Sequence, residues 1–242
     1  MLSNPVKIFK IGFRQVLRDG MLLILIPAPF LMAVAMRLLL PLADQLIQQQ
    51  TGVVITPWYP VSDTLVLTMT PVMTAMISAL LILEERDEGI GMYYNITPAS
   101  GYSYLIARIA LPMIWGLLSS VLVIAFFAFV RYPPSIIITA AGIATLQGVI
   151  MSMFLVAVAG NKVEGLALAK LTNIFVMGFI VPWLITSPLR FIFAVLPSFW
   201  IGEIINNSGL GILPTILHGA AGLISCIVFI TLLTRLFLKR IT

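Results

Sequence analysis

Long apolar runs separated by short polar segments dominate the chain. A helix that crosses about 30 Å of hydrocarbon needs about 20 predominantly apolar residues. These runs lack the strict alternation of transmembrane β-strands, and a helix satisfies its own backbone in lipid. The pattern therefore predicts an all-α membrane protein with six transmembrane helices, at Met21–Leu42, Val61–Leu83, Tyr104–Val130, Ser135–Ala159, Leu166–Thr186 and Ile212–Phe237.

Two further segments have a different pattern. Within residues 3–19, Lys7, Lys10, Arg14 and Arg18 share one helical face opposite an apolar stripe, which predicts an interfacial amphipathic helix. A simple basic flank beside the first span is the alternative. Residues 187–211 are aromatic, apolar and broken by prolines, which favours a re-entrant extracellular segment. We interpret residues 1–242 as a single transmembrane domain, in which residues 84–103 form a cytoplasmic loop.

Composition supports this interpretation. The chain is 60% hydrophobic and only 10% charged, whereas soluble domains carry about 25% charged residues. The sequence pI of about 9.6 does not indicate nucleic-acid binding, because the basic residues lie at the ends of apolar runs. With both termini in the cytoplasm, every Lys and Arg except Arg37, Arg131 and Arg190 falls on the inner side. The positive-inside rule therefore predicts a multi-pass protein of the inner (plasma) membrane with this orientation.

Several classes of chemistry lack their sequence signals. The chain has no Gly-rich phosphate-binding loop, no His-Glu-x-x-His pattern and a single cysteine, Cys226. We therefore expect no enzyme activity, no metal and no cofactor in this chain itself. Any ATP hydrolysis must come from a partner.

The most informative stretch is Glu84–Arg108. It holds four acidic residues within five positions, followed by glycines, a pair of tyrosines and a Thr-Pro-Ala-Ser element. Such a segment cannot lie in hydrocarbon, and its length exceeds a minimal helix connector. It predicts a structured cytoplasmic docking element, and a solvated helix end with chance acidity is the alternative.

This stretch resembles the permeases of ABC-2 type exporters. Glu85-Arg86-Asp87-Glu88-Gly89 is followed by Thr97-Pro98-Ala99-Ser100, with Pro98 nine positions after Gly89 and Arg108 ten positions after Pro98. The resemblance implies a bacterial exporter in which this loop is the coupling helix that contacts a cytoplasmic ABC ATPase subunit, which binds ATP and Mg. It also implies a second permease copy, identical or not. The coupling residues it implies are Glu84, Glu85, Arg86, Asp87, Glu88, Gly89, Tyr93, Pro98, Ser100 and Arg108.

Candidates for the translocation path are fewer. Arg37 is a charge within an apolar run and either lines a cavity or snorkels to the interface. Thr70, Thr74 and Ser78 recur every four residues, and with Asn173 they either line a weakly polar path or serve helix packing. The mostly apolar spans favour an amphipathic or hydrophobic cargo such as a drug-like molecule, a lipid-linked compound or a peptide.

Two other functions stay open. One is an ion-coupled secondary transporter, which would need buried titratable groups that these spans largely lack. The other is a non-transport membrane scaffold or immunity protein.

Overall fold

The computed structural model describes residues 20–89 and 101–241 of the chain. These residues are almost entirely helical and contain no β-strand. Six helical stretches among them are long and apolar enough to cross a membrane, which confirms the predicted fold class. The proposed interfacial helix at 3–19 lies outside the described residues.

The helices follow one another along the chain with short connections. The α-helices are α2 (Gly20–Leu25), α3 (Ala28–Thr51), α4 (Tyr59–Asp87), α6 (Gly101–Phe127), α7 (Pro134–Val158), α8 (Lys162–Val176), α9 (Val181–Leu184), α10 (Pro197–Asn206) and α11 (Ile212–Ile241). The described residues also form three 3₁₀ helices: η1 (Thr56–Trp58), η2 (Met177–Ile180) and η3 (Pro188–Val195).

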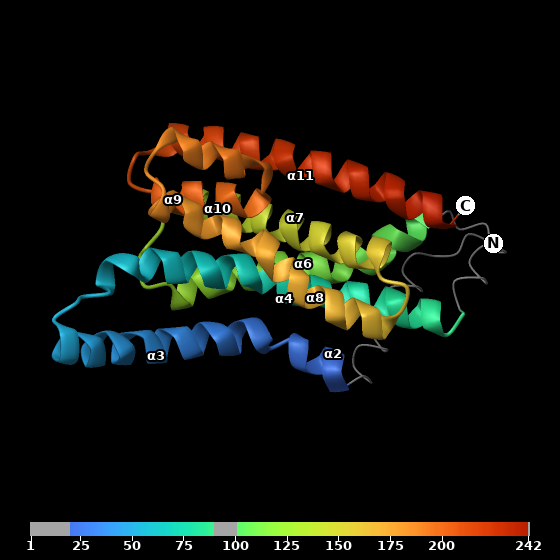
Figure 1. The fold of residues 1–242 in the computed structure, drawn as a ribbon, viewed down its shortest axis with the longest axis horizontal. Coiled ribbons are helices and arrows are strands. Elements are labelled where there is room, and N and C mark those ends of the chain that lie inside the picture. The colour runs from blue at the N-terminus through green and yellow to red at the C-terminus, as the bar shows by residue number, and fades with distance from the viewer. Residues whose placement is uncertain (1–19, 90–100, 242) are drawn as a thin grey trace.

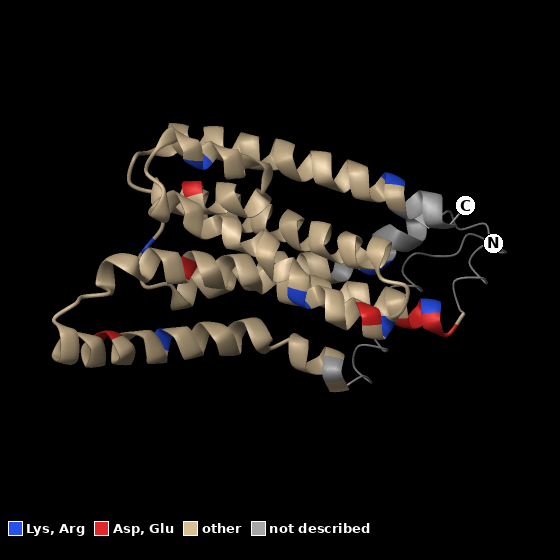
Figure 2. Cartoon of the chain, viewed as in Figure 1, with Lys and Arg blue, Asp and Glu red and all other residues tan. Residues whose placement is uncertain are grey.

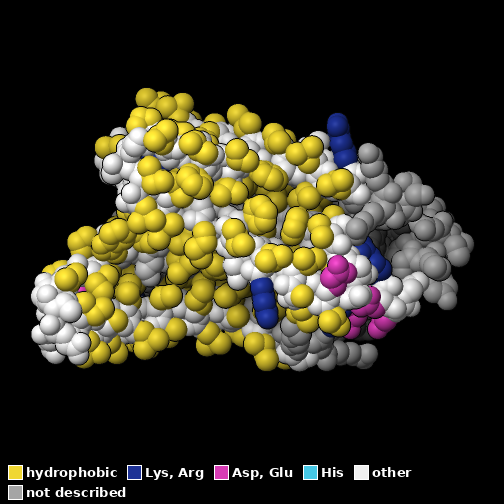
Figure 3. Space-filling model, in the orientation of Figure 1, with side chains coloured by type: hydrophobic (Ala, Val, Ile, Leu, Met, Phe, Trp, Pro, Cys, Tyr) yellow, Lys and Arg dark blue, Asp and Glu magenta, His cyan; other side chains and the backbone are white. Residues whose placement is uncertain are grey.

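Helices α4 and α7 form the centre of the bundle. In each of them 78% of the most apolar window is buried, against 11% in α3 and 22% in α11. Figure 1 shows α3 and α11 along opposite edges of the bundle, and α4, α6 and α7 between them. Hydrophobic side chains cover most of the face shown in Figure 3, as expected of a surface in contact with lipid.

The predicted end of the first span was wrong, and the span is divided near its start. The first apolar run breaks at Ile26–Pro27 into α2 and α3, because proline at the helix start cannot continue the preceding turn. Helix α3 then continues well past Leu42 to Thr51 and ends at Gly52, whose φ of 72° is left-handed. Hydropathy alone missed this polar extension of about two and a half turns.

Pro71 interrupts the hydrogen bonding of the central helix α4, and its neighbours pack closely against it. A Cβ added at Gly148 of α7 would lie 2.6 Å from the Pro71 carbonyl oxygen. One added at Gly116 of α6 would lie 3.3 Å from the Pro71 Cβ. Glycines on both adjacent helices therefore allow the backbones to approach at the proline.

The aromatic segment before the last span forms two short helices, η3 and α10. Phe199 and Ile201 of α10 are completely buried, so this helix belongs to the bundle core. The Trp200 indole Nε1 donates to the Ala194 carbonyl at 2.8 Å and joins the two helices. Whether the segment re-enters the membrane stays a prediction.

Candidate functional site

Charged side chains gather at one end of the bundle, where α4 ends (Figure 2). We call this region the acidic end, and define it as Glu84–Gly89, Arg108 on α6 and the α7–α8 connection at residues 159–164. Helix α2 begins and α11 ends on the same side (Figure 1). The acidic end contains the two flanks of the predicted coupling loop, whose residues 90–100 lie outside the described part of the chain.

A buried ion pair joins these two flanks. The Arg108 guanidinium donates from Nε to Glu85 Oε2 at 3.2 Å, and its Nη2 also contacts Glu85 Oε1. Both side chains are only 2% exposed. The Arg108 carbonyl in turn accepts a hydrogen bond from Ser78 Oγ at 3.1 Å. The end of α4 and the start of the described part of α6 are therefore held together by charge.

The neighbouring residues join α4 to α7 and α8. Arg86 donates to the carbonyls of Ala159 at 2.7 Å and Val156 at 3.0 Å, which would otherwise be free at the end of α7. Glu84 accepts from Lys162 Nζ at 3.1 Å, and Asp87 accepts from the Lys162 backbone N–H at 2.9 Å. The acidic end thus fixes four helix ends relative to one another.

Part of the acidic end remains accessible. Asp87 and Glu88 are exposed, and Gly89 has a left-handed φ of 70° at the point where α4 ends. Among the predicted coupling residues, Glu85 and Arg108 are buried, and Tyr93, Pro98 and Ser100 lie outside the described residues. Asp87 and Glu88 are therefore accessible to a partner, although Asp87 also accepts the Lys162 N–H.

The hydroxyl groups on α4 bond to nearby backbone. Thr70 donates to the Val66 carbonyl and Thr74 to the Pro71 carbonyl, within their own helix. All three hydroxyl residues, Ser78 included, are buried. A cavity beside Ser78 and Pro71 measures about 10 Å³, room for about one water molecule. The described interior of a single chain therefore offers no channel at this level.

The other two path candidates are exposed. Arg37 donates to the Ala128 carbonyl at 3.1 Å and lies 4.9 Å from the Phe129 ring centroid, so it braces the end of α6. Asn173 is exposed on α8. The five candidates therefore do not form one cluster.

At the opposite end of the bundle, carboxylates hold the segments between helices in place through hydrogen bonds and an ion pair. Sequence reasoning missed this role. Asp44 accepts from the Ile55 N–H at 2.8 Å and the Thr56 hydroxyl at 2.9 Å. Glu203 is completely buried and pairs with Arg190 at 2.8 Å. These acids are occupied by structural contacts, which weakens the case for a proton relay.

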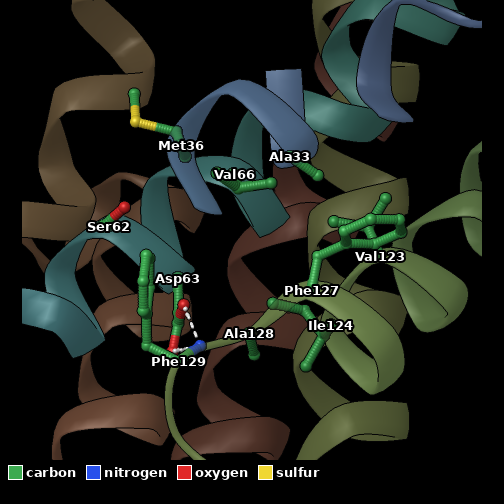
Figure 4. Close-up of a pocket in the computed structure, with 10 residues that line it drawn as sticks. All are labelled: Ala33, Met36, Ser62, Asp63, Val66, Val123, Ile124, Phe127, Ala128 and Phe129. Carbon is green, nitrogen blue, oxygen red and sulfur yellow. Dashed lines mark hydrogen bonds between the residues drawn. The ribbon is translucent and has the colours of Figure 1, made fainter. Parts of the chain in front are cut away.

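Asp63 holds the connection between α6 and α7 in place by accepting hydrogen bonds from its backbone. It accepts from the Phe129 N–H at 2.9 Å and the Val130 N–H at 3.1 Å. The Tyr132 hydroxyl also donates to it at 3.1 Å, and burial together with this carboxylate raises the pKa of Tyr132. Figure 4 shows Asp63 beside a cavity of about 10 Å³ between α3, α4 and α6. This cavity has room for about one water molecule and none for a cargo.

No group of three or more His, Cys, Asp or Glu side chains that could hold a metal ion occurs in the part of the chain that the structure describes. The single cysteine, Cys226, is buried. The contacts at the acidic end join neighbouring helices and leave acidic side chains exposed, so this region can transmit a movement from one helix to another.

Comparison with known proteins identifies the relatives of the chain. The family model described as "Fluoroquinolones export permease protein Rv2686c-like" matches residues 12–234. Two Mycobacterium tuberculosis proteins are each 28% identical over 208 residues, which cover 82% of this chain and 81% of the relative. They are the fluoroquinolones export permease proteins Rv2686c (strain ATCC 25618 / H37Rv) and MT2760 (strain CDC 1551 / Oshkosh).

Proposed function

The chain belongs to the family of Rv2686c-like fluoroquinolones export permease proteins, and from this premise we propose that it works with a separate ATPase subunit. Its family and its six apolar helices identify it as a transporter subunit of the bacterial cell membrane rather than an enzyme. The ABC-2 resemblance seen in the coupling motif agrees with this family. The sequence lacks a phosphate-binding loop of its own, so any ATP that powers transport would be bound by a partner subunit.

The observation that carries the proposal is the construction of the acidic end. The buried pair Glu85–Arg108 ties the end of α4 to α6, while Asp87 and Glu88 remain exposed at the end of α4. Helices joined in this way can move together when a partner docks against the exposed acids. Because Arg86 and Glu84 extend the connections to α7 and α8, the movement would reach four helices together.

The acidic end then lies in the cytoplasm, where the ATPase subunit is found. The positive-inside rule supports this orientation, since Arg86, Lys162 and Arg235 all lie at or near helix ends on this side. ATP would shift the transporter by binding better to one arrangement of the docked subunits than to the other. Pro71, enclosed by Gly116 and Gly148, is the place where α4 would bend.

The path for the cargo would lie between two permease copies. The two cavities described above hold about one water each, which is too small for any drug-like molecule. By analogy with the named relatives, the cargo would be an amphipathic molecule of the fluoroquinolone type. An interface lined by the largely apolar helix faces suits such a molecule.

A pair of exposed substitutions tests the docking. Asp87→Asn with Glu88→Lys changes the exposed charges, and the asparagine oxygen can still accept from the Lys162 N–H. Co-purification of the ATPase subunit with the permease should fall sharply. Gln49→Lys, an exposed change at the far end of α3, is the control and should have no effect. Unchanged recovery of the ATPase with the double variant would refute the docking assignment.

A further inference from the structure

Two polar residues lie within a candidate span and have no partner among the residues that the structure describes. Lys170 and Asn173 are both exposed on α8, one helical turn apart and therefore on the same face. Neither makes a hydrogen bond or an ion pair with any residue that the structure describes. Their neighbours Leu171, Ile174 and Met177 are exposed apolar residues, so the polar pair lies within a hydrophobic surface. Figure 3 shows a basic side chain within the hydrophobic surface over α8.

Their depth makes them unusual. With a rise of about 1.5 Å per residue, Lys170 lies about 12 Å and Asn173 about 16 Å along the axis from the start of α8. The candidate span runs from Lys162 to Leu184, so Asn173 is close to its middle. Other basic residues of the described spans are different: Arg235 lies near the end of α11, and Arg37 is bonded to the Ala128 carbonyl.

Lipid contact alone does not account for the pair. A lysine can extend its ammonium group toward the interface, but the short asparagine side chain cannot. Unpaired polar groups facing hydrocarbon are costly, and polar residues within spans usually face a water-filled cavity or a bundle interior. The geometry therefore indicates that this face of α8 borders the transport path instead of lipid.

We propose that Lys170 and Asn173 bind the anionic group of an amphipathic organic acid that the transporter exports. The Lys170 ammonium supplies the charge, the Asn173 amide supplies a second donor, and the exposed apolar residues around them receive the ring system of the cargo. This assignment rests on the proposed export function and specifies the cargo class. A carboxylate is the complement of one ammonium and one amide donor.

The test uses two matched compounds and the complex of permease and ATPase in proteoliposomes. One compound is a fluoroquinolone with its free carboxylate, and the other is its ethyl ester. Lys170→Met should lower ATP-dependent transport of the acid by about tenfold or more, because a charge-assisted contact is lost. Transport of the ester should not change. Lys170→Arg should restore transport of the acid, and Asn173→Leu should give a smaller loss.

Arg235→Met is the control, since it removes an exposed basic residue near the end of α11. It should leave the ratio of acid to ester transport unchanged. Transport of the acid at the wild-type rate by Lys170→Met would overturn the proposal and assign the lysine to the lipid interface. Dissociation of the complex in size-exclusion chromatography would overturn it too, in favour of a contact between subunits.

A binding measurement separates this proposal from the proposed function. Equilibrium binding of the same two compounds to the detergent-purified complex requires no transport. If Lys170→Met binds the acid more weakly than the wild type does but binds the ester equally well, the site is supported. This holds even if the wild-type complex transports neither compound. In that case the export function fails while the binding site stands. Equal affinity of the wild-type complex and the Lys170→Met complex for the acid would refute the site.

Discussion

Removal of the Glu85 carboxylate should destabilise the protein far more than removal of any exposed acid nearby. Glu85→Ala leaves the Arg108 guanidinium in a site where only 2% of the side chain is exposed. Breaking a buried ion pair by removing one partner costs about 3–5 kcal/mol. That is a large share of the roughly 5–15 kcal/mol by which folded proteins are typically stable.

Replacement of both partners should cost much less. In Glu85→Leu/Arg108→Met, apolar side chains of similar size occupy the site and both charges of the pair are removed together. Such replacements are often neutral for stability. The difference between the double variant and the sum of the single variants therefore measures the coupling between α4 and α6.

Unfolding of the purified protein in detergent, followed by circular dichroism, measures these differences. Glu88→Ala is the matched control, because this acid is exposed and its removal should change stability by no more than about 0.5 kcal/mol. The reasoning would be refuted if Glu85→Ala lowered the free energy of unfolding by less than about 1 kcal/mol. It would also be refuted if Glu85→Leu/Arg108→Met were as unstable as Glu85→Ala.

Three further predictions concern packing and the connections. Gly148→Ala should destabilise by about 1–3 kcal/mol, because its Cβ would lie 2.6 Å from the Pro71 carbonyl oxygen, whereas Gly142→Ala on the same helix has open space and should be neutral or stabilising in thermal unfolding. Asp63→Ala leaves the N–H groups of Phe129 and Val130 without their acceptor, so hydrogen exchange at these two amides should become faster while exchange in the middle of α7 is unchanged. Arg190→Met leaves the buried Glu203 carboxylate without a countercharge, although Asn207 still donates to it, and should cost about 1–3 kcal/mol, whereas the exposed Arg131→Met should change stability little; equal effects of the two would contradict the role of the pair.

The helical architecture could be predicted from the sequence because lipid imposes a simple rule on long apolar runs. Six spans follow from run length and hydropathy alone. Helix ends were less predictable, since the polar residues after Leu42 continue α3 although hydropathy does not recognise them as helix. The break at Pro27 follows from the proline itself, which cannot continue the preceding turn.

The acidic run and its spacing to Arg108 predicted a coupling element, and this role stays a prediction. The structure brings Glu84–Gly89 and Arg108 together at the acidic end. Long-range pairing was not visible in one sequence: Glu85 and Arg108 lie 23 positions apart, and Arg86 and Ala159 lie 73 apart. Sequence reasoning therefore treated the acidic run as one docking surface, whereas Glu85 and Arg86 hold helices together and the acids that follow them are exposed.

The central claim is that this permease exports its cargo only with energy from a separate ATPase. The most direct test measures fluoroquinolone transport in proteoliposomes that contain the permease alone or the permease with its ATPase subunit. We predict transport that requires both proteins and ATP, with none when the permease alone is given a proton or sodium gradient. Transport by the permease alone, driven by an ion gradient, would contradict the account.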